Sequence, residues 1–490
     1  MSEPALPDQG IAVELAALRA QLLAKDERID ALLVQVGELT AQVQALVLKL
    51  SKDSSTSSKP PSSDGPGKRP RGGSSRTRSG RKPGKQPGDP GTTLRHLDDP
   101  KERIAIPAPA ACARCESSLL EVPVREVRRR QVFDLPEPVP VEVTEYAAEV
   151  KCCPDCGTKQ AGVFPAGVES SVQYGPEVIA KVADAVLAHH IPVHRSTLLV
   201  MELCGIKVST GFAAALRGRA ARLLENTFLP AVRALIATAP VVHADETFTR
   251  TAGGTVFVHA AVTEHLTALH TGNRSAVAID AGDVLPHLSG VLVRDGYAGY
   301  SHLDHVLHAW CGAHLLRDLR GIHEADSEGQ LWARAMADTL LEANRLAQAA
   351  REAGRETLSQ AELATIQRLY TGALARSRQD NPNKNSELAH HAQTLARRFE
   401  VHRDFILRFT ADLAVPFSNN QAERDVRPVK VQQRSSGGGW RTLTGLADFA
   451  IVQSYLSTAT KWGIRRYDAL KRLFSTGAWI PHTLTPDATA

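Results

Sequence analysis

Two aspartates follow apolar runs whose ends could present carboxylates for metal chemistry. Asp245 comes directly after residues 240–244, and Asp295 comes directly after residues 290–294. Runs of this length and composition are typical of buried strands, so each carboxylate would emerge at or near the end of a strand. Glu246, the next residue, would point to the opposite face. The two aspartates can therefore meet over one sheet.

A glutamate further along the chain is the third candidate. Ser418, followed three residues later by Gln421, is a capping-box pattern that places Glu423 in the first turns of a helix. Asp425 would project from another face of that helix, and Pro428 should end or kink it soon afterwards. A helix end can therefore direct Glu423 toward the two aspartates.

These three acids suit divalent-metal chemistry on phosphodiesters. Mg²⁺ (or Mn²⁺) prefers oxygen ligands, and two such ions about 4 Å apart can activate an attacking oxygen and stabilise a leaving one. Asp245, Asp295 and Glu423 are thus the candidate catalytic residues and magnesium ligands. An aspartate at a strand end is also a common turn former or helix cap, so each acid taken alone is open to that interpretation.

The elements that must position the acids can be read from the residues between them. Segments 255–261 and 267–270 have the pattern of further strands, and Gly253-Gly254 is typical of a hairpin turn before the first of them. The sequence therefore predicts a mostly antiparallel run of strands between Asp245 and Asp295.

With their neighbours, the three acids resemble the insertion sequence 66 family of bacterial transposases. The catalytic core of that family carries Ala-Asp-Glu-Thr, Asp-Gly-Tyr-x-x-Tyr and Ser-Asn-Asn-x-x-Glu-Arg segments, and matching segments begin here at Ala244, Asp295 and Ser418. Residues 57–64 resemble the family's Ser-Ser-Lys-Pro-Pro-Ser-Ser-Asp signature. The resemblance covers nearly the whole chain.

One departure from the family pattern follows the second acid. Family members commonly have Cys-x-Ala-His followed soon by paired arginines, whereas here Arg317 and Arg320 are separated after Cys311 and His314. This separation puts in doubt a shared role of the two arginines in phosphate contact.

The resemblance implies a DDE transposase with a ribonuclease-H-like catalytic core. Such an enzyme binds terminal inverted repeats and target DNA; metal-activated water cuts one strand, and the exposed 3′-hydroxyl attacks the target. A homodimer or higher oligomer is expected, and a need for accessory proteins of the same element is left open. Two other interpretations also stay open: a zinc-containing DNA-binding regulator without catalysis, and a metal-dependent nuclease that cuts without joining.

Length and composition predict a multidomain α+β protein. The chain has 490 residues, too many for one compact core, with 43% apolar and 5% aromatic residues. It shows neither a signal-sequence pattern nor an apolar run of membrane-spanning length, so we expect a cytoplasmic, nucleoid-associated bacterial protein. The expected catalytic core comprises residues 239–310 and 411–465, interrupted by a helical insertion at 311–410 and followed by a C-terminal tail at 466–490.

Two Cys-x-x-Cys pairs predict a zinc-binding module over residues 96–165. Seven cysteines in a cytoplasmic chain argue against disulfides, and pairs with this spacing can hold one tetrahedral Zn²⁺. The alternatives are four unligated thiols, or Cys152 as a substitute ligand. The family resemblance implies the same module. The expected ligands are Cys112, Cys115, Cys153 and Cys156.

The amino-terminal segment predicts a dimerising coiled coil over residues 11–50. Apolar residues alternate at intervals of three and four, with Ile29, Val36 and Val43 at a positions and mainly leucine at d, a pattern that favours two strands. Lys25 at a d position costs stability but limits alternative arrangements. A single amphipathic helix lying on the protein's own body is the alternative.

Residues 51–95 are predicted to be a disordered basic linker. This segment is rich in Ser, Gly and Pro and cannot bury enough apolar surface to fold. Its charges would gain counterion-release energy on a polyanion, although a solubilising spacer is also consistent with the composition. Its basic residues include Lys68, Arg69, Arg71, Arg76, Arg78, Arg81, Lys82 and Lys85.

A helical, helix-turn-helix-like region is predicted over residues 172–238. A short helix over 195–203, a glycine turn at Gly205 and a second helix from Val208 would present Arg195, Arg217 and Arg219 to a DNA groove. Helix pairs joined by a glycine turn are also common in proteins that do not bind DNA.

Other arginines and histidines are less decisive. A glycine-rich loop between Arg434 and Arg441 lacks the ending of a nucleotide-binding loop and is interpreted as a DNA-contacting loop. The remaining arginines could clamp phosphates or pair with local acids. The histidines after the second acid follow no recognised ligand spacing and favour packing or phosphate contact. The remaining arginines are Arg294, Arg317, Arg424 and Arg427, and the histidines are His302, His305, His308 and His314.

Overall fold

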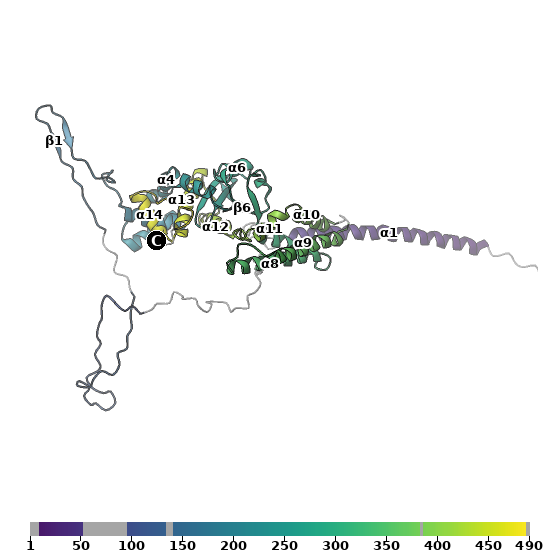
Figure 1. Ribbon diagram of the computed structural model, residues 1–490, viewed down its shortest axis with the longest axis horizontal. Helices are drawn as coiled ribbons and strands as arrows, with labels where there is room; N and C mark the ends of the chain where they lie inside the picture. The colour runs from purple at the N-terminus through teal and green to yellow at the C-terminus, as the bar shows by residue number, and fades with distance from the viewer. Residues whose placement is uncertain (1–8, 52–95, 134–140, 383–385, 487–490) are drawn as a thin grey trace, which may run out of the picture.

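A computed structural model of the chain describes residues 9–51, 96–133, 141–382 and 386–486 (Figure 1). The predicted basic linker and the Ser-rich signature at residues 57–64 lie outside the described residues. The described part combines one mixed sheet with many helices, so the expected mixed α and β composition is confirmed.

The centre of the molecule is a five-stranded sheet in the order β5-β4-β3-β6-β7. The first three strands in sequence form an antiparallel meander, and the last two run parallel to β3. The strands are β3 (Val241–Thr251), β4 (Gly254–Val262), β5 (Thr267–Gly272), β6 (Val291–Arg294) and β7 (Leu307–Trp310). The predicted run of antiparallel strands between Asp245 and Asp295 is therefore confirmed.

The hairpin between β3 and β4 turns one residue earlier than expected. Thr251 pairs with Gly254, so the two-residue loop is Ala252-Gly253 rather than Gly253-Gly254. Both loop residues have positive φ, 48° and 82°, as a type I′ turn requires. The right-handed strand twist selects this turn even though Ala252 must adopt a conformation that glycine takes more easily.

The two faces of the sheet are covered by different helices. Val242, Ala244 and Leu292 pack into a core with α4 (Thr210–Glu225), α5 (Phe228–Ala237) and α14 (Arg466–Ser475). Residues of the opposite parity, among them Ala260 and Val293, face α12 (Asn420–Ser435), α8 (Leu331–Glu352) and α11 (Arg403–Ala411). The long helix α13 (Leu443–Lys461) packs along β5 and contributes to both cores. Asp245 shares the parity of the face that α12 covers.

The helices before the sheet follow the sequence pattern. The structure has α2 (Pro176–Ala183), continued by the π-helix Asp184–Ala188, then α3 (Val193–Cys204) and α4. Gly205 ends α3 with φ 67°, and the Ser209 hydroxyl caps α4 by accepting from Phe212 N–H. The helix, glycine turn and helix are thus confirmed as structure. Residues 466–490, which were expected to form a C-terminal tail, contain α14. The buried face of α14 packs into the core that also holds Val242, Ala244 and Leu292.

The region between β7 and α12 is helical, as expected. Trp332, Met336, Tyr370 and Phe399 form the centre of its own apolar core. Ser359 starts one of these helices with a capping box that includes Glu362. Besides α8 and α11, the helices are α7 (Gly312–Ala325), α9 (Gln360–Asp380) and α10 (Glu387–Val401). In Figure 1, α8, α9 and α10 lie to one side of the sheet.

The amino-terminal elements extend away from this body. Helix α1 (Gln9–Ser51) passes beside α10 and projects outward (Figure 1). The short strands β1 (Val150–Cys152) and β2 (Lys159–Ala161) pair at the end of an extended arm (Figure 1). Among the described residues, no helix combines the length and apolarity needed to cross a membrane.

Candidate active site

Asp245 and Asp295 occupy equivalent positions on neighbouring parallel strands. The last paired residues of β3 and β6 are His243 and Val293. Asp245 lies two positions after His243, and Asp295 lies two positions after Val293. Residues with the same parity on paired parallel strands point to the same face, and adjacent strands lie about 4.8 Å apart. The register therefore brings Asp245 and Asp295 to neighbouring positions, and the negative charge of Asp295 raises the pKa of Asp245.

The expectation that Asp245 lies near a strand end needs a correction. Strand β3 continues to Thr251, because its second half pairs with β4 in the hairpin. What ends near Asp245 is the pairing with β6, since β6 stops at Arg294 and Asp295 follows at once. The sheet opens at this point, and an open edge between two strands gives both carboxylates room.

The site is electrostatically strained in a way that fits a cation. Burial raises the pKa of Asp245 well above its usual range, and the negative charges of Glu246, Asp295 and Glu423 raise it further. Burial also raises the pKa of Glu423, while Arg317 and Arg427 oppose that shift. Acids that repel one another are the donor set that Mg²⁺ needs, so the residues present fit divalent cations.

Glu423 nevertheless lies toward α7 rather than centrally between the aspartates. Its Oε1 atom is 3.6 Å from an Arg317 guanidinium nitrogen and 3.8 Å from His314 Nδ1. The donor atoms of Glu423, His314 and Cys311 all lie within 4.8 Å of one another, a group that does not include the aspartates. The trio of acids is thus gathered in one region, and Glu423 must turn toward the aspartates to share an ion with them.

Glu246 points to the opposite face from Asp245, as expected, and forms a network there. It accepts hydrogen bonds from Arg274 Nε at 2.8 Å and from the Tyr300 hydroxyl at 2.8 Å. The Arg274 guanidinium stacks 3.8 Å from the centre of the Tyr297 ring. The two tyrosines of the Asp-Gly-Tyr-x-x-Tyr segment thus hold the loop after Asp295 against β3. Sequence reasoning gave no role to Arg274, which stands in no motif.

Asn419 connects three elements of the site. Its side chain bonds to His243 Nδ1 at 2.9 Å and donates to the Ala244 carbonyl at 2.7 Å, and its backbone N–H donates to Cys311 Sγ at 3.1 Å. Burial lowers the pKa of His243, so its neutral ring donates to the Asn419 amide oxygen. The start of α12 is thereby fixed to β3 beside Asp245 and to the end of β7.

This arrangement replaces the predicted capping box. Asn419, not Ser418, is the N-cap of α12, and no side chain caps the helix. The asparagine amide is engaged by β3 instead. The expectation that α12 ends soon after Pro428 is also wrong, because the helix continues to Ser435, while a kink at Pro428 stays a prediction. Pro428 removes the hydrogen bond to the Arg424 carbonyl, and Arg424 is exposed, so water can satisfy that carbonyl.

Replacing Asn419 with alanine tests this connection. Asn419→Ala leaves the buried Ala244 carbonyl and His243 ring without partners, so we expect a loss of about 1–3 kcal/mol of stability and a lower rate of catalysis. Thermal unfolding of the full chain measures the first. The control is Asn226→Ala, at the exposed C-cap of α4, which should change neither quantity. An Asn419→Ala protein with unchanged unfolding would contradict the assigned role.

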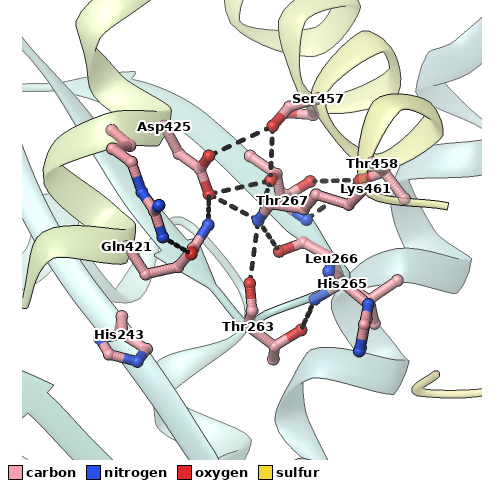
Figure 2. A network of polar contacts seen from close by, with 12 residues as sticks. His243, Thr263, His265, Leu266, Thr267, Gln421, Asp425, Ser457, Thr458 and Lys461 are labelled. Carbon is pink, nitrogen blue, oxygen red and sulfur yellow. Dashed lines mark hydrogen bonds and ion pairs between the residues drawn. The ribbon is translucent and has the colours of Figure 1, made fainter. Parts of the chain in front are cut away.

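A buried ion pair fixes the far side of α12. In Figure 2, Lys461 of α13 contacts Asp425 of α12, the carbonyls of Thr263 and Leu266, and the Thr267 hydroxyl. The distance from Lys461 Nζ to Asp425 Oδ2 is 2.6 Å. The pair is about nine-tenths buried. Asp425 lies two residues after Glu423 and contacts Thr267 and Lys461, whereas Glu423 contacts Arg317 of α7, as predicted for two different faces of the helix. This network sets the rotation of α12 about its axis.

Arg294 has a structural position. It is 2% exposed, bonds to His308 Nδ1 at 3.0 Å, and donates to the carbonyls of Asp295 and Tyr297 at 2.9 and 3.0 Å. Burial lowers its pKa to about 10. The guanidinium therefore holds the loop that carries Asp295. This role differs from both interpretations made from the sequence, which were a phosphate contact and a salt bridge to a local acid.

The other candidate DNA-binding arginines divide by exposure. Arg217 stacks over Trp440 at 5.5 Å and is largely buried, which lowers its pKa. Arg317 is 18% exposed beside Glu423. The backbone N–H of Trp440 donates to the Arg250 carbonyl at 2.8 Å and fixes the glycine-rich loop. The exposed glycines of this loop therefore lie beside the end of β3. The exposed members are Arg195, Arg219, Arg424, Arg427, Arg434 and Arg441.

The two Cys-x-x-Cys pairs form matching turns but stay apart. In the first, Cys112 N–H donates to the Ser117 carbonyl; in the second, Cys153 N–H donates to the Thr158 carbonyl. The thiols of Cys115 and Cys156 form hydrogen bonds with the hydroxyls of Ser117 and Thr158, and these bonds lower the pKa of each thiol. Within the described ranges, the four sulfur atoms do not form one donor group. The zinc module stays a prediction.

The three other histidines after the second acid make ordinary contacts. His308 accepts from Arg294, His302 pairs with Asp280 at 2.7 Å, and His305 bonds to the Leu285 carbonyl. His314 differs, because it belongs to the donor group with Cys311. The signal that could have identified it is the Cys-x-x-His spacing at the start of α7, which places both donors on one helical turn.

Comparison with known protein families gives two matches. Residues 171–447 match the family described as Transposase IS66 family, and residues 1–95 match a family of unknown function (DUF6444). No curated protein matches the chain. The first match spans more than half of the 490 residues and contains Asp245, Asp295 and Glu423.

Proposed function

The chain belongs to the IS66 family of transposases, and we propose that it cuts and joins DNA with divalent cations held by Asp245, Asp295 and Glu423. The observation that supports this proposal is the register of β3 and β6, in which Asp245 and Asp295 each lie two positions beyond a paired residue, with the parity of the face that α12 covers. The meander of three strands followed by two parallel strands supports a ribonuclease-H-like core.

The chemistry divides between the ions and the chain. When bound, Mg²⁺ or Mn²⁺ supplies activation of the attacking oxygen and neutralisation of charge on the leaving oxygen. The chain contributes the carboxylates, which are partly buried, and the charges of Asp295 and Glu423 raise the pKa of Asp245. Asn419 and the Asp425–Lys461 pair hold α12 so that Glu423 stays near the aspartates. These residues position the reacting groups, which is most of what a protein adds to this chemistry.

The DNA would lie along the exposed arginines. Arg424 and Arg427 stand on the first turns of α12 beside the acids, and Arg434 and Arg441 flank the glycine-rich loop. Arg195 lies on the exposed side of α3, in the helix-turn-helix-like part of the chain. Guanidinium groups match phosphate oxygens in a two-pronged geometry. We therefore assign terminal inverted repeats and target DNA to this surface.

The amino-terminal helix would hold two copies together. Leu18, Ile29, Leu32, Val36 and Leu39 of α1 are each more than half exposed, although their spacing is that of a coiled-coil seam. A seam of this length needs a partner, and a second copy of α1 is self-complementary to it. Light scattering should give a dimeric mass for the full chain; a monomeric mass would refute the assignment.

A strand-transfer assay tests the proposed activity. Purified full-length protein is incubated with labelled ends of the element, a target plasmid and Mg²⁺, and the products are separated on denaturing gels. We expect cleaved ends and ends joined to the plasmid, neither of which forms with EDTA. Cleavage without joining would favour the nuclease interpretation. Binding without either product would favour a regulator and overturn the proposal.

A further inference from the structure

Cys311, His314 and Glu423 form a donor group that the proposed magnesium chemistry does not use. Cys311 is the N-cap of α7, His314 lies one turn later on the same helix, and Glu423 faces them from α12. Their donor atoms lie within 4.8 Å of one another, and His314 Nδ1 is 3.8 Å from Glu423 Oε1. Ligands of one tetrahedral zinc are separated by roughly 3.5 Å, so small side-chain movements suffice.

The state of His314 independently indicates a ligand. Its side chain is 13% exposed, and its Nδ1 atom is closed off from solvent without a hydrogen-bond partner among the described residues. A buried imidazole nitrogen without a partner costs free energy. Nδ1 is the atom that lies 3.8 Å from Glu423 Oε1. A cation bound there would satisfy it.

The surroundings of Cys311 supply groups that stabilise a metal-bound thiolate, although burial raises the pKa of the free thiol to about 11. Its sulfur accepts the N–H of Asn419, and it stands at the amino end of the 14-residue helix α7. Backbone N–H donors and the positive end of a helix both stabilise a bound thiolate. The Asn419 contact also fixes the direction of the sulfur, as the hydrogen bonds around metal ligands commonly do.

We propose that Cys311, His314 and Glu423 bind Zn²⁺ or a similar divalent transition metal, at a site that shares Glu423 with the carboxylate trio. One sulfur, one nitrogen and one oxygen ligand select zinc-like cations, whereas Mg²⁺ prefers oxygen alone. Three protein ligands leave a fourth tetrahedral position for water.

Sharing Glu423 gives the site a regulatory consequence, which rests on the proposed function. A zinc ion at Cys311 and His314 holds the Glu423 carboxylate toward α7, the side where it already lies 3.6 Å from Arg317. Glu423 is then withheld from Asp245 and Asp295. Zinc should therefore inhibit magnesium-dependent strand transfer. The positive charge of Arg317 competes with the metal for Glu423 and limits the affinity of the site.

Cobalt binding tests the site directly. Co²⁺ is titrated into the reduced, metal-free full-length chain, and thiolate-to-cobalt charge-transfer absorption is recorded. We expect the wild type to bind one more equivalent than Cys311→Ser. His314→Gln should bind the same equivalent at least about tenfold more weakly. The matched control, Cys204→Ser, changes a half-buried cysteine outside the group and should titrate like the wild type.

The comparison remains valid whether or not the Cys-x-x-Cys pairs bind metal, because those pairs are present in every variant. Circular dichroism confirms that each variant is folded. Equal cobalt stoichiometry and affinity in all four proteins would overturn the proposed site.

A second measurement separates this site from the proposed activity. Asp245→Asn should keep the extra cobalt equivalent while losing strand transfer. If the cobalt equivalent is present but no protein transfers strands, the proposed function fails and the metal site stands. Where transfer is observed, Zn²⁺ should inhibit the wild type at concentrations at least about tenfold below those needed for His314→Gln, each normalised to its own activity with Mg²⁺. Equal inhibition would overturn the regulatory consequence.

Discussion

Asp245→Asn is expected to lower strand cleavage and strand transfer by roughly 10³-fold or more, because metal ions supply several kcal/mol of transition-state stabilisation and each 1.4 kcal/mol is a factor of about ten. DNA affinity should change little, since the exposed arginines are untouched. Gel-shift and strand-transfer assays measure the two effects. Asp283→Asn, at an exposed aspartate outside the site, is the control and should behave like the wild type. Retained joining by Asp245→Asn would remove Asp245 from the site.

The same substitution should make the metal-free protein more stable at neutral pH. The folded-state pKa of Asp245 is raised by burial and by neighbouring acids, so its contribution to stability is present below about pH 4 and is lost as pH rises through the raised value. The asparagine side chain of the variant cannot ionise. We therefore expect a melting temperature a few degrees above the wild type at pH 7 and a smaller difference at about pH 4. Mg²⁺ or Mn²⁺ should stabilise the wild type more than the variant.

Lys461→Met is expected to cost about 3–5 kcal/mol of stability, because it leaves Asp425 buried without its cation. The Thr263 and Leu266 carbonyls also lose their donor. The shift of the urea-unfolding transition of the full chain measures the loss. Strand transfer should fall as well, since α12 is no longer held in the rotation that directs Glu423.

A double variant separates the ion pair from simple disruption of the core. Adding Asp425→Leu to Lys461→Met removes the unpaired charge and should recover much of the lost stability, because apolar replacements of buried ion pairs are often tolerated. Lys471→Met, which breaks the exposed contact with Glu177, serves as the comparison and should have little effect. If the single and double variants unfold alike, the charge on Asp425 is not the cause.

The strands and helices that carry the acids could be predicted because their signals are local. The apolar runs before Asp245 and Asp295 became β3 and β6, and the glycine turn at Gly205 separates two helices where expected. Periodicity and turn chemistry act over a few residues, so one sequence is enough to read them. The three acids themselves were found because each stands in a short recognisable segment.

The contacts that hold the site together could not be predicted in the same way. Asn419 follows Ser418 in a pattern that reads equally well as a capping box, and only the tertiary fold brings β3 within reach of its amide. Lys461 and Asp425 are 36 residues apart and show no pattern that links them. Arg294 looked like a phosphate ligand because its burial depends on β7 and the following loop. Such partners are defined by contacts between distant segments.

The helical insertion departs from the sheet and returns to it at one place. The insertion begins at Cys311 and Gly312 and ends at Phe417 and Asn419. Two hydrogen bonds join these ends: Asn419 N–H donates to Cys311 Sγ, and Gly312 N–H donates to the Phe417 carbonyl. A side chain at position 312 would collide with the Phe417 ring. The chain therefore leaves and re-enters the core at adjacent points, while α8 and α11 of the insertion also pack against β6 and β7. Because His314 and Arg317 of α7 lie beside Glu423, a tilt of the insertion would change the surroundings of that carboxylate.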